Sequence, residues 1–140
     1  MDRQEAITES LKLVERSAVC MVGTITEDGF PNIKSMFNLK HDGFKRFWFS
    51  TNTSSRRVKQ LQNDKRGCVY FLDEILGQGL MLVGTIEILQ DIESKKLLWT
   101  EKSEKYYSFG TEDPDYAVLC FTAAQGNYYH ELSNVDFEIK

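Results

Sequence analysis

The stretch that decides the fold runs from residue 47 to residue 61 and reads FWFSTNTSSRRVKQL. Its aromatic start predicts a strand, which ends in two hydroxyl residues, Ser50 and Thr51. A polar turn follows, and Ser55 then predicts the N-cap of a short helix that continues to Asn63. The rest of the chain is expected to be arranged around this strand–turn–helix unit.

The start of this helix has the chemistry of a phosphate socket. Free N–H groups and the helix dipole favour an anion at a helix N-terminus. The hydroxyl groups of Ser50, Thr51 and Ser55 can donate hydrogen bonds to it. Arg56 or Arg57 can bind two phosphate oxygens at once through its guanidinium group. The alternative interpretation is an ordinary capped helix whose arginines lie in solvent.

Outside this unit the pattern predicts a mainly β protein with helices (α+β), in a single domain over residues 1–140. It contains six to seven strands and about three helices. The expected helices are 2–16, 55–63 and 91–107. The expected strands are 18–26, 31–39, 44–50, 67–73, 80–89, 116–122 and 127–130, with a last short run at 135–139.

The turns indicate how the strands are connected. Asp-Gly pairs at 28–29 and 42–43 predict two hairpins, so the first three strands are expected to form a meander. Residues 77–79 are expected to be a loop, and Gly84 within a strand indicates a bulge or a close backbone approach. Because helices interrupt a mainly antiparallel series, a closed or half-closed barrel is expected rather than a sandwich.

Composition narrows the class of protein. The net charge of −4 argues against a protein with a general nucleic-acid-binding surface, which needs an excess of basic residues. No apolar run is long enough to span a membrane. The polar N-terminus is not that of a secretory signal, and Cys20, Cys68 and Cys120 are dispersed in apolar runs. We therefore expect reduced cysteines, no metal site and a cytoplasmic protein.

Taken in order, the motifs resemble those of the pyridoxamine 5'-phosphate oxidase-like, FMN-binding split-barrel superfamily, in its general stress protein branch. Residues 50–57 are similar to its FMN-phosphate motif, and the resemblance covers about Val19 to Tyr129. The other matching pieces are the Asp-Gly-x-Pro hairpin at 28–36, the strand entry at 63–69, the strand at 81–87, and the acidic turn at 110–116 with Tyr128 and Tyr129.

The resemblance implies an antiparallel split β-barrel and a homodimer that holds FMN at its subunit interface. It also implies the roles of individual residues. These are Lys34, Ser35, Met36 and Phe37 along the flavin ring; Ser50 and Thr51 at flavin or ribityl atoms; Asn52 and Ser55 in the turn; Arg56 and Arg57 at the phosphate; and Gly79 and Leu80 from the partner subunit or the barrel floor.

Two departures from the family bear on the substrate. Leu39 stands where the oxidase carries a substrate-binding lysine, and residues 135–140 lack its Arg-x-His-type segment. Pyridoxamine phosphate is therefore not the expected substrate. The expected function is an FMN-dependent oxidoreductase, stress-related, that passes electrons from a reduced nicotinamide to an acceptor. The alternatives are a flavin store or redox sensor without turnover, and the same fold with haem or a deazaflavin.

Overall fold

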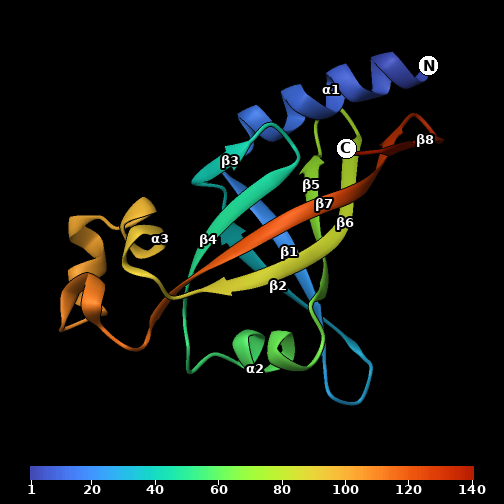
Figure 1. Cartoon of the computed structure of the whole chain (residues 1–140). Helices are drawn as coiled ribbons and strands as arrows, with labels where there is room; N and C mark the ends of the chain where they lie inside the picture. The colour runs from blue at the N-terminus through green and yellow to red at the C-terminus, as the bar shows by residue number, and fades with distance from the viewer.

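Eight antiparallel strands curl into a half-barrel in the computed structural model, which describes all 140 residues (Figure 1). Their order is β2-β1-β5-β6-β7-β4-β3, and β8 pairs with β7. The strands are β1 (Val19–Ile25), β2 (Pro31–Phe37), β3 (Lys40–Asp42), β4 (Arg46–Asn52), β5 (Arg66–Asp73), β6 (Gln78–Leu89), β7 (Tyr116–His130) and β8 (Ser133–Glu138). The predicted fold class is confirmed, with eight strands rather than six or seven.

Helices close the two ends of the barrel (Figure 1). Helix α1 (Arg3–Arg16) is capped by Asp2 and buries Leu13 and Val14 in the main core. Helix α2 (Arg56–Asn63) covers the opposite end, with Leu61 in the same core. Both helices follow the sequence prediction, because each carries one apolar face at helical spacing and a good N-cap residue.

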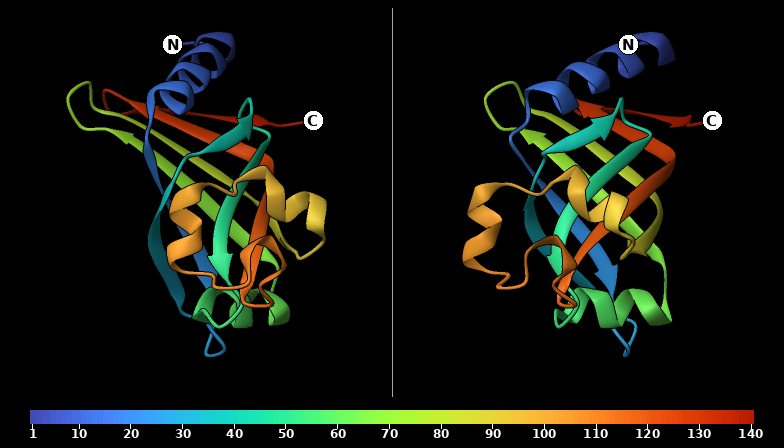
Figure 2. Two further views of the ribbon diagram at one scale, coloured as in Figure 1. Left: turned by 90° about the vertical axis from the view of Figure 1, so that its left-hand side faces the viewer. Right: turned by 60° about the vertical axis from the view of Figure 1, so that its left-hand side comes forward.

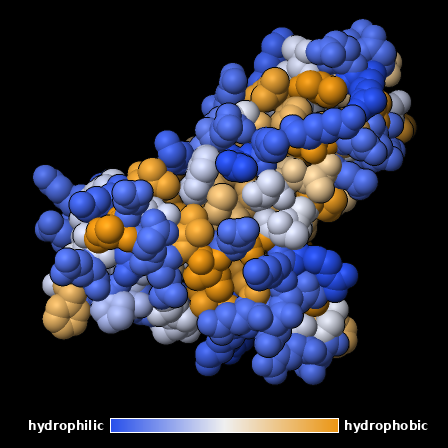
Figure 3. Space-filling model, viewed as in Figure 1, coloured by the Kyte–Doolittle hydropathy of each residue, from blue (hydrophilic) through white to orange (hydrophobic).

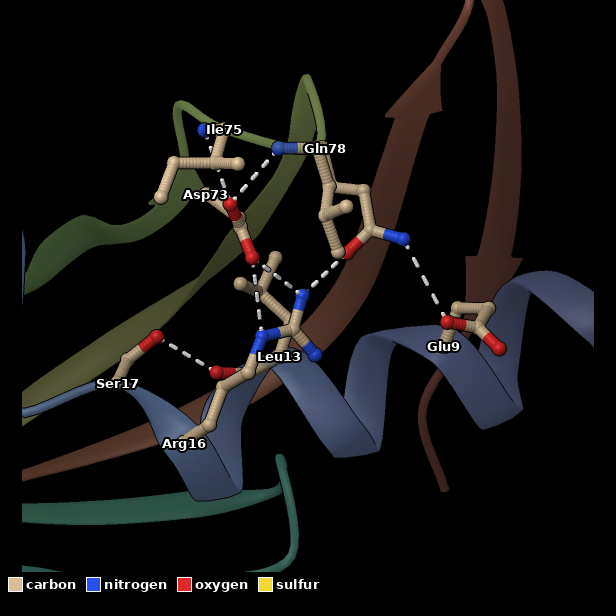
Figure 4. A network of polar contacts seen from close by, with 8 residues as sticks. Glu9, Leu13, Arg16, Ser17, Asp73, Ile75 and Gln78 are labelled. Atoms are coloured by element: carbon tan, nitrogen blue, oxygen red, sulfur yellow. Dashed lines mark hydrogen bonds and ion pairs between the residues drawn. The ribbon is translucent and has the colours of Figure 1, made fainter.

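A polar network fastens α1 to the hairpin between β5 and β6 (Figure 4). The guanidinium of Arg16 donates to the Asp73 carboxylate at 3.0 and 3.1 Å and also to the side-chain oxygen of Gln78. The amide nitrogen of Gln78 in turn donates to Glu9 at 3.5 Å. Since these partners are far apart in sequence, the network sets how the helix lies on the barrel.

The predicted three-strand meander is wrong. Strands β1 and β2 form one hairpin and β3 and β4 another, but β2 pairs only with β1, and β4 pairs with β7 and β3. The chain changes direction at Asn38, whose side-chain amide donates to the carbonyl groups of Val14 and Ser17 at 3.0 Å each. This contact with the end of α1 separates β2 from β3 and leaves the barrel split.

Three further boundaries differ from the prediction. Residues 78 and 79 begin β6 instead of a loop, because only Gly77 needs a positive φ, of 67°. The expected helix over 91–107 is broken into α3 (Ile92–Leu97) and a 3₁₀ helix, η1 (Glu101–Lys105). The two expected strands within 116–130 are one strand, β7, which continues across a bulge opposite the Val83/Gly84 step.

The connection between β6 and β7, residues 90–115, is called the excursion below. It contains α3, η1 and a second 3₁₀ turn, η2 (Gly110–Glu112). Figure 2 shows the excursion standing in front of β4 and β7, outside the barrel. Leu98 from the excursion packs there on Tyr116 and Val118 of β7, which makes a second, smaller core.

The surface is divided between polar helices and an apolar middle. On the face drawn in Figure 3, hydrophilic side chains dominate α1, α2 and the excursion, while hydrophobic side chains gather between them. None of the helices has the length and apolar character needed to cross a bilayer.

Candidate functional site

The split in the barrel forms a groove between β2 and β4. These two strands are not hydrogen-bonded to each other, and a cavity of about 220 Å³ lies between them. The groove is lined by Ser35, Met36, Phe37, Leu39, Phe49, Ser50 and Arg57. It therefore brings together residues from β2, from the end of β4 and from the start of α2.

Arg57 is the one charged side chain of this groove. Its Nη2 atom donates to the Thr51 hydroxyl at 3.4 Å, whereas its Nε atom is buried and has no hydrogen-bond partner. Burial lowers the pKa of the Arg57 guanidinium. Leaving a buried donor unpaired is costly, so the geometry favours an anion that accepts from this side chain.

The turn before α2 is ordered by its own hydroxyl groups. Ser55 caps the helix, since its Oγ atom accepts from the Val58 amide at 3.3 Å and lies 3.4 Å from the Thr51 hydroxyl. The side-chain amide of Asn52 donates to the Ser54 hydroxyl at 2.7 Å. Free N–H groups at the start of α2 therefore lie beside Arg57, as the sequence predicts.

Asp115, at the end of the excursion, forms hydrogen bonds with this turn. Its carboxylate accepts from the Thr53 hydroxyl and the Ser54 amide, each at 2.9 Å, and from the Ser54 hydroxyl at 3.2 Å. The Thr53 amide also donates to the Asp115 carbonyl at 2.7 Å. These bonds, led by the one from the Ser54 amide, lower the pKa of Asp115.

The structure brings some of the predicted site residues together in the groove and not others. Arg56 is exposed on α2, and Lys34 is exposed and outside the groove lining. Leu80 is fully buried in the main core, and a Cβ atom at Gly79 would lie 2.2 Å from the Tyr70 hydroxyl. Within one chain, neither of these two β6 residues reaches the groove, and their role through a partner subunit stays a prediction.

A larger cavity, of about 890 Å³, adjoins the groove and shares Phe37, Leu39 and Ser50 with it. It is called the side cavity below. Its remaining lining comes from the excursion and the start of β7: Leu98, Thr100, Glu101, Lys102, Ser103, Tyr106, Tyr107 and Tyr116. The groove and the side cavity are therefore neighbours that share part of their walls.

The sequence did not reveal the role of Asp115 or the residues of the excursion that line the side cavity. The Asp115 side chain meets partners 61 and 62 residues away in the sequence, so no local spacing reveals the contact. Tyr106 and Tyr107 carry no local signal that distinguishes a cavity wall from packing within a helix.

Comparisons with known proteins agree with this geometry. The family model described as pyridoxamine 5'-phosphate oxidase like matches residues 5–140. The pyridoxine/pyridoxamine 5'-phosphate oxidase of Bombyx mori is 28% identical over 89 residues, which make up 64% of this chain and 34% of that protein. The chain thus spans about a third of the length of this curated relative.

Among solved structures, a protein related to general stress protein 26 from Clostridium acetobutylicum is 55% identical and has a TM-score of 0.86, over 99% of this chain and 97% of that one. An FMN-binding, pyridoxamine 5'-phosphate oxidase-related protein from Nostoc punctiforme is 12% identical, with a TM-score of 0.69 over 100% and 98% of the two chains. A haem-binding protein from Mycobacterium smegmatis is 15% identical, with a TM-score of 0.76 over 99% and 60%.

The last two likenesses show the fold alone, because their sequence identities are low. The family match is of a different kind, since it extends over nearly the whole chain. The resemblance seen in the motifs is confirmed, and the chain belongs to the pyridoxamine 5'-phosphate oxidase-like family.

Proposed function

We propose that this protein is an FMN-binding oxidoreductase that passes electrons from a reduced nicotinamide to an acceptor. The observation that carries the proposal is the buried, unpartnered Nε atom of Arg57 in the groove. A phosphate group would pair with this atom and with the free N–H groups at the start of α2.

At about 220 Å³ the groove is smaller than FMN, so it would hold the phosphate end while the ring extends along the exposed edge of β2. Ser35, Met36 and Phe37 offer one edge of β2 to a flat ring, and Ser50 offers a hydroxyl from β4. Bound FMN would supply the electron-transfer chemistry, and the protein would contribute position, electrostatics and exclusion of water. The side chains named here bind and orient the cofactor, with Arg57 neutralising its phosphate.

The lining also favours FMN over haem. Histidine and cysteine are common protein ligands of haem iron, and the groove is lined by neither. Met36 is the one groove side chain of a haem-ligating type, and methionine usually ligates haem iron together with a histidine. An arginine among hydroxyl groups is instead typical of a phosphate-binding site. We therefore assign the groove to a phosphate-bearing flavin.

We further propose that two chains pair through an apolar sheet face. Residues on the outer side of β1, β2, β5, β6 and β7 are exposed although they are large and hydrophobic. These are Val19, Met21, Ile33, Phe37, Tyr70, Leu72, Met81 and Tyr129. Their register makes the face continuous, since Met21 pairs with Tyr70 and Tyr70 with Met81. Such a patch is typical of a subunit interface.

The groove lies at the margin of this face. Phe37 belongs to both, and Ser35 of the groove pairs with Met21 of the face. A second chain seated on the face would therefore border the groove and shield a bound flavin from water. This arrangement is consistent with FMN at a subunit interface and with Gly79, in register with Leu72 and Tyr129 of the face, approaching from the partner. The Leu80 side chain instead lies in the core of its own chain.

The two adjacent arginines provide the test. Arg57→Ala is expected to weaken FMN binding about 100-fold, because hydrogen bonds from a charged donor to phosphate are lost inside the groove. Arg56→Ala is the matched control and should change affinity only slightly, because Arg56 is exposed outside the groove. Fluorescence titration of FMN measures both. Equal affinities in wild type and Arg57→Ala would contradict the assignment of the groove.

A further inference from the structure

The side cavity is placed to hold a second ligand against the flavin. It shares Phe37, Leu39 and Ser50 with the groove, so a molecule in one would border a molecule in the other. Its volume of about 890 Å³ is four times that of the groove, at about 220 Å³, and is enough for a ring compound.

The walls of the side cavity are suited to a flat, apolar ligand. Phe37, Leu39 and Tyr106 are 69%, 60% and 73% exposed, and all three line it. Exposed aromatic and aliphatic side chains around a cavity gain free energy when a ring covers them. Glu101 and Lys102 add one negative and one positive charge, which favours a ligand without net charge over a phosphate ester.

One polar group in the wall has no partner. Tyr116 is fully buried, and its hydroxyl makes no hydrogen bond. The ring of Tyr107 stands edge-on to it at 4.8 Å, and that of Trp99 at 5.0 Å. Burial raises the pKa of Tyr107, with smaller contributions from Asp115, Tyr116 and Asp113, so its phenol remains a neutral donor at pH 7. Tyr116 lines the cavity while its hydroxyl is buried behind this wall without a partner, so what would satisfy it is a hydrogen-bond acceptor that reaches it from the cavity side.

We propose that the side cavity binds a quinone, a flat aromatic dicarbonyl compound, as the electron acceptor, with Tyr116 donating a hydrogen bond to a carbonyl oxygen. The inference rests on the proposed function, because the bound flavin forms one border of the cavity. The overall reaction balances: a reduced nicotinamide gives up a hydride, solvent gives one proton, and the quinone gains two electrons and two protons to become a hydroquinone.

The test uses two probes of the same shape and one matched variant. Equilibrium dialysis of the FMN-loaded protein measures the affinity for 1,4-naphthoquinone and for naphthalene, which lacks the carbonyl oxygens. Tyr116→Phe should weaken naphthoquinone binding about tenfold and leave naphthalene unaffected. Tyr128→Phe is the control, since Tyr128 is equally buried with an unpartnered hydroxyl but lies in the main core, outside the side cavity.

Naphthoquinone binding that is no tighter than naphthalene binding in the wild type would overturn the inference, and so would equal effects of the two tyrosine variants. Flavin absorbance, recorded on the same samples, reports separately on the proposed function. A chain that keeps its flavin but fails the quinone test loses this inference alone. A chain that cannot hold flavin overturns the proposed function and, with it, the acceptor role.

Discussion

Gly84 lies where the backbone of β7 approaches β6 too closely for a side chain. A Cβ atom there would lie 1.9 Å from the carbonyl oxygen of Thr122, on the neighbouring strand. The pairing register also shifts at this point, between Val83 and Gly84. The bulge expected from the sequence is therefore confirmed, and its reason is steric: no side chain fits against that carbonyl.

Gly84→Val should consequently destabilise the fold by about 2–4 kcal/mol, because two paired strands must separate to admit the side chain. Denaturant unfolding followed by circular dichroism measures this. Ala124→Val, at an exposed neighbouring position of β7, should stay within about 0.5 kcal/mol of the wild type. Similar losses of unfolding free energy in Gly84→Val and Ala124→Val would show that the close approach at Gly84 does not contribute to stability.

At the same scale, the sequence predicted the chemistry of the groove better than its geometry. Ser50, Thr51, Ser55 and Arg57 lie at or beside the groove because strand end, turn and cap are local features with recognisable signals. The sequence could not separate Arg57 from Arg56. Which of two adjacent helix residues faces the barrel depends on how α2 rests on distant strands, and local spacing does not contain that information.

Among the elements, the excursion is joined to the β4–α2 turn by Asp115. Its carboxylate holds the Thr53 hydroxyl and both polar groups of Ser54, so the β4–α2 turn depends on a residue from the other side of the site. The same excursion supplies most of the side-cavity wall. A displaced excursion would therefore disturb both the turn and the cavity.

Asp115→Ala should lower both the melting temperature at pH 7 and the affinity for FMN, because three hydrogen bonds to the turn are lost. The folded-state pKa of Asp115 is lowered, so its stabilising effect is present above the unfolded pKa of about 3.9 and is lost as pH falls below it. Thermal scans should thus show that the difference in melting temperature between wild type and Asp115→Ala becomes smaller below about pH 4.

Glu112→Ala is the control for this experiment, since Glu112 is an exposed acid on the same excursion. It should leave both the melting temperature and FMN affinity close to the wild-type values. A difference in melting temperature between wild type and Asp115→Ala that is independent of pH would mean that the carboxylate charge does not stabilise the contact with the β4–α2 turn.

The elements that the sequence predicted wrongly were set by tertiary contacts. The helix expected over 91–107 ends early because Leu98 packs on β7, and the chain restarts at the Thr100–Ser103 capping box as η1. The meander failed because β4 finds its partner in β7, about 70 residues on, in place of β2. Hairpin signals identify turns, but they do not say which strands meet across the barrel.

At the scale of the whole molecule, the exposed apolar face and the groove are adjacent and are both suited to the proposed dimer. A single chain leaves Ile33 and Leu72 more than half exposed, at 62% and 61%, on a sheet face that no helix covers. A second copy of the chain would bury these side chains and border the groove at Phe37. The proposed dimer and the proposed cofactor are therefore expected to occur together.

The most direct test of the account is size-exclusion chromatography with light scattering on protein that has been mixed with excess FMN and desalted. We expect flavin absorbance to elute with the protein, at about one flavin per chain, in a peak with the mass of two chains. Flavin that elutes as a free small molecule would contradict the account, because the groove at Arg57 would then hold no cofactor.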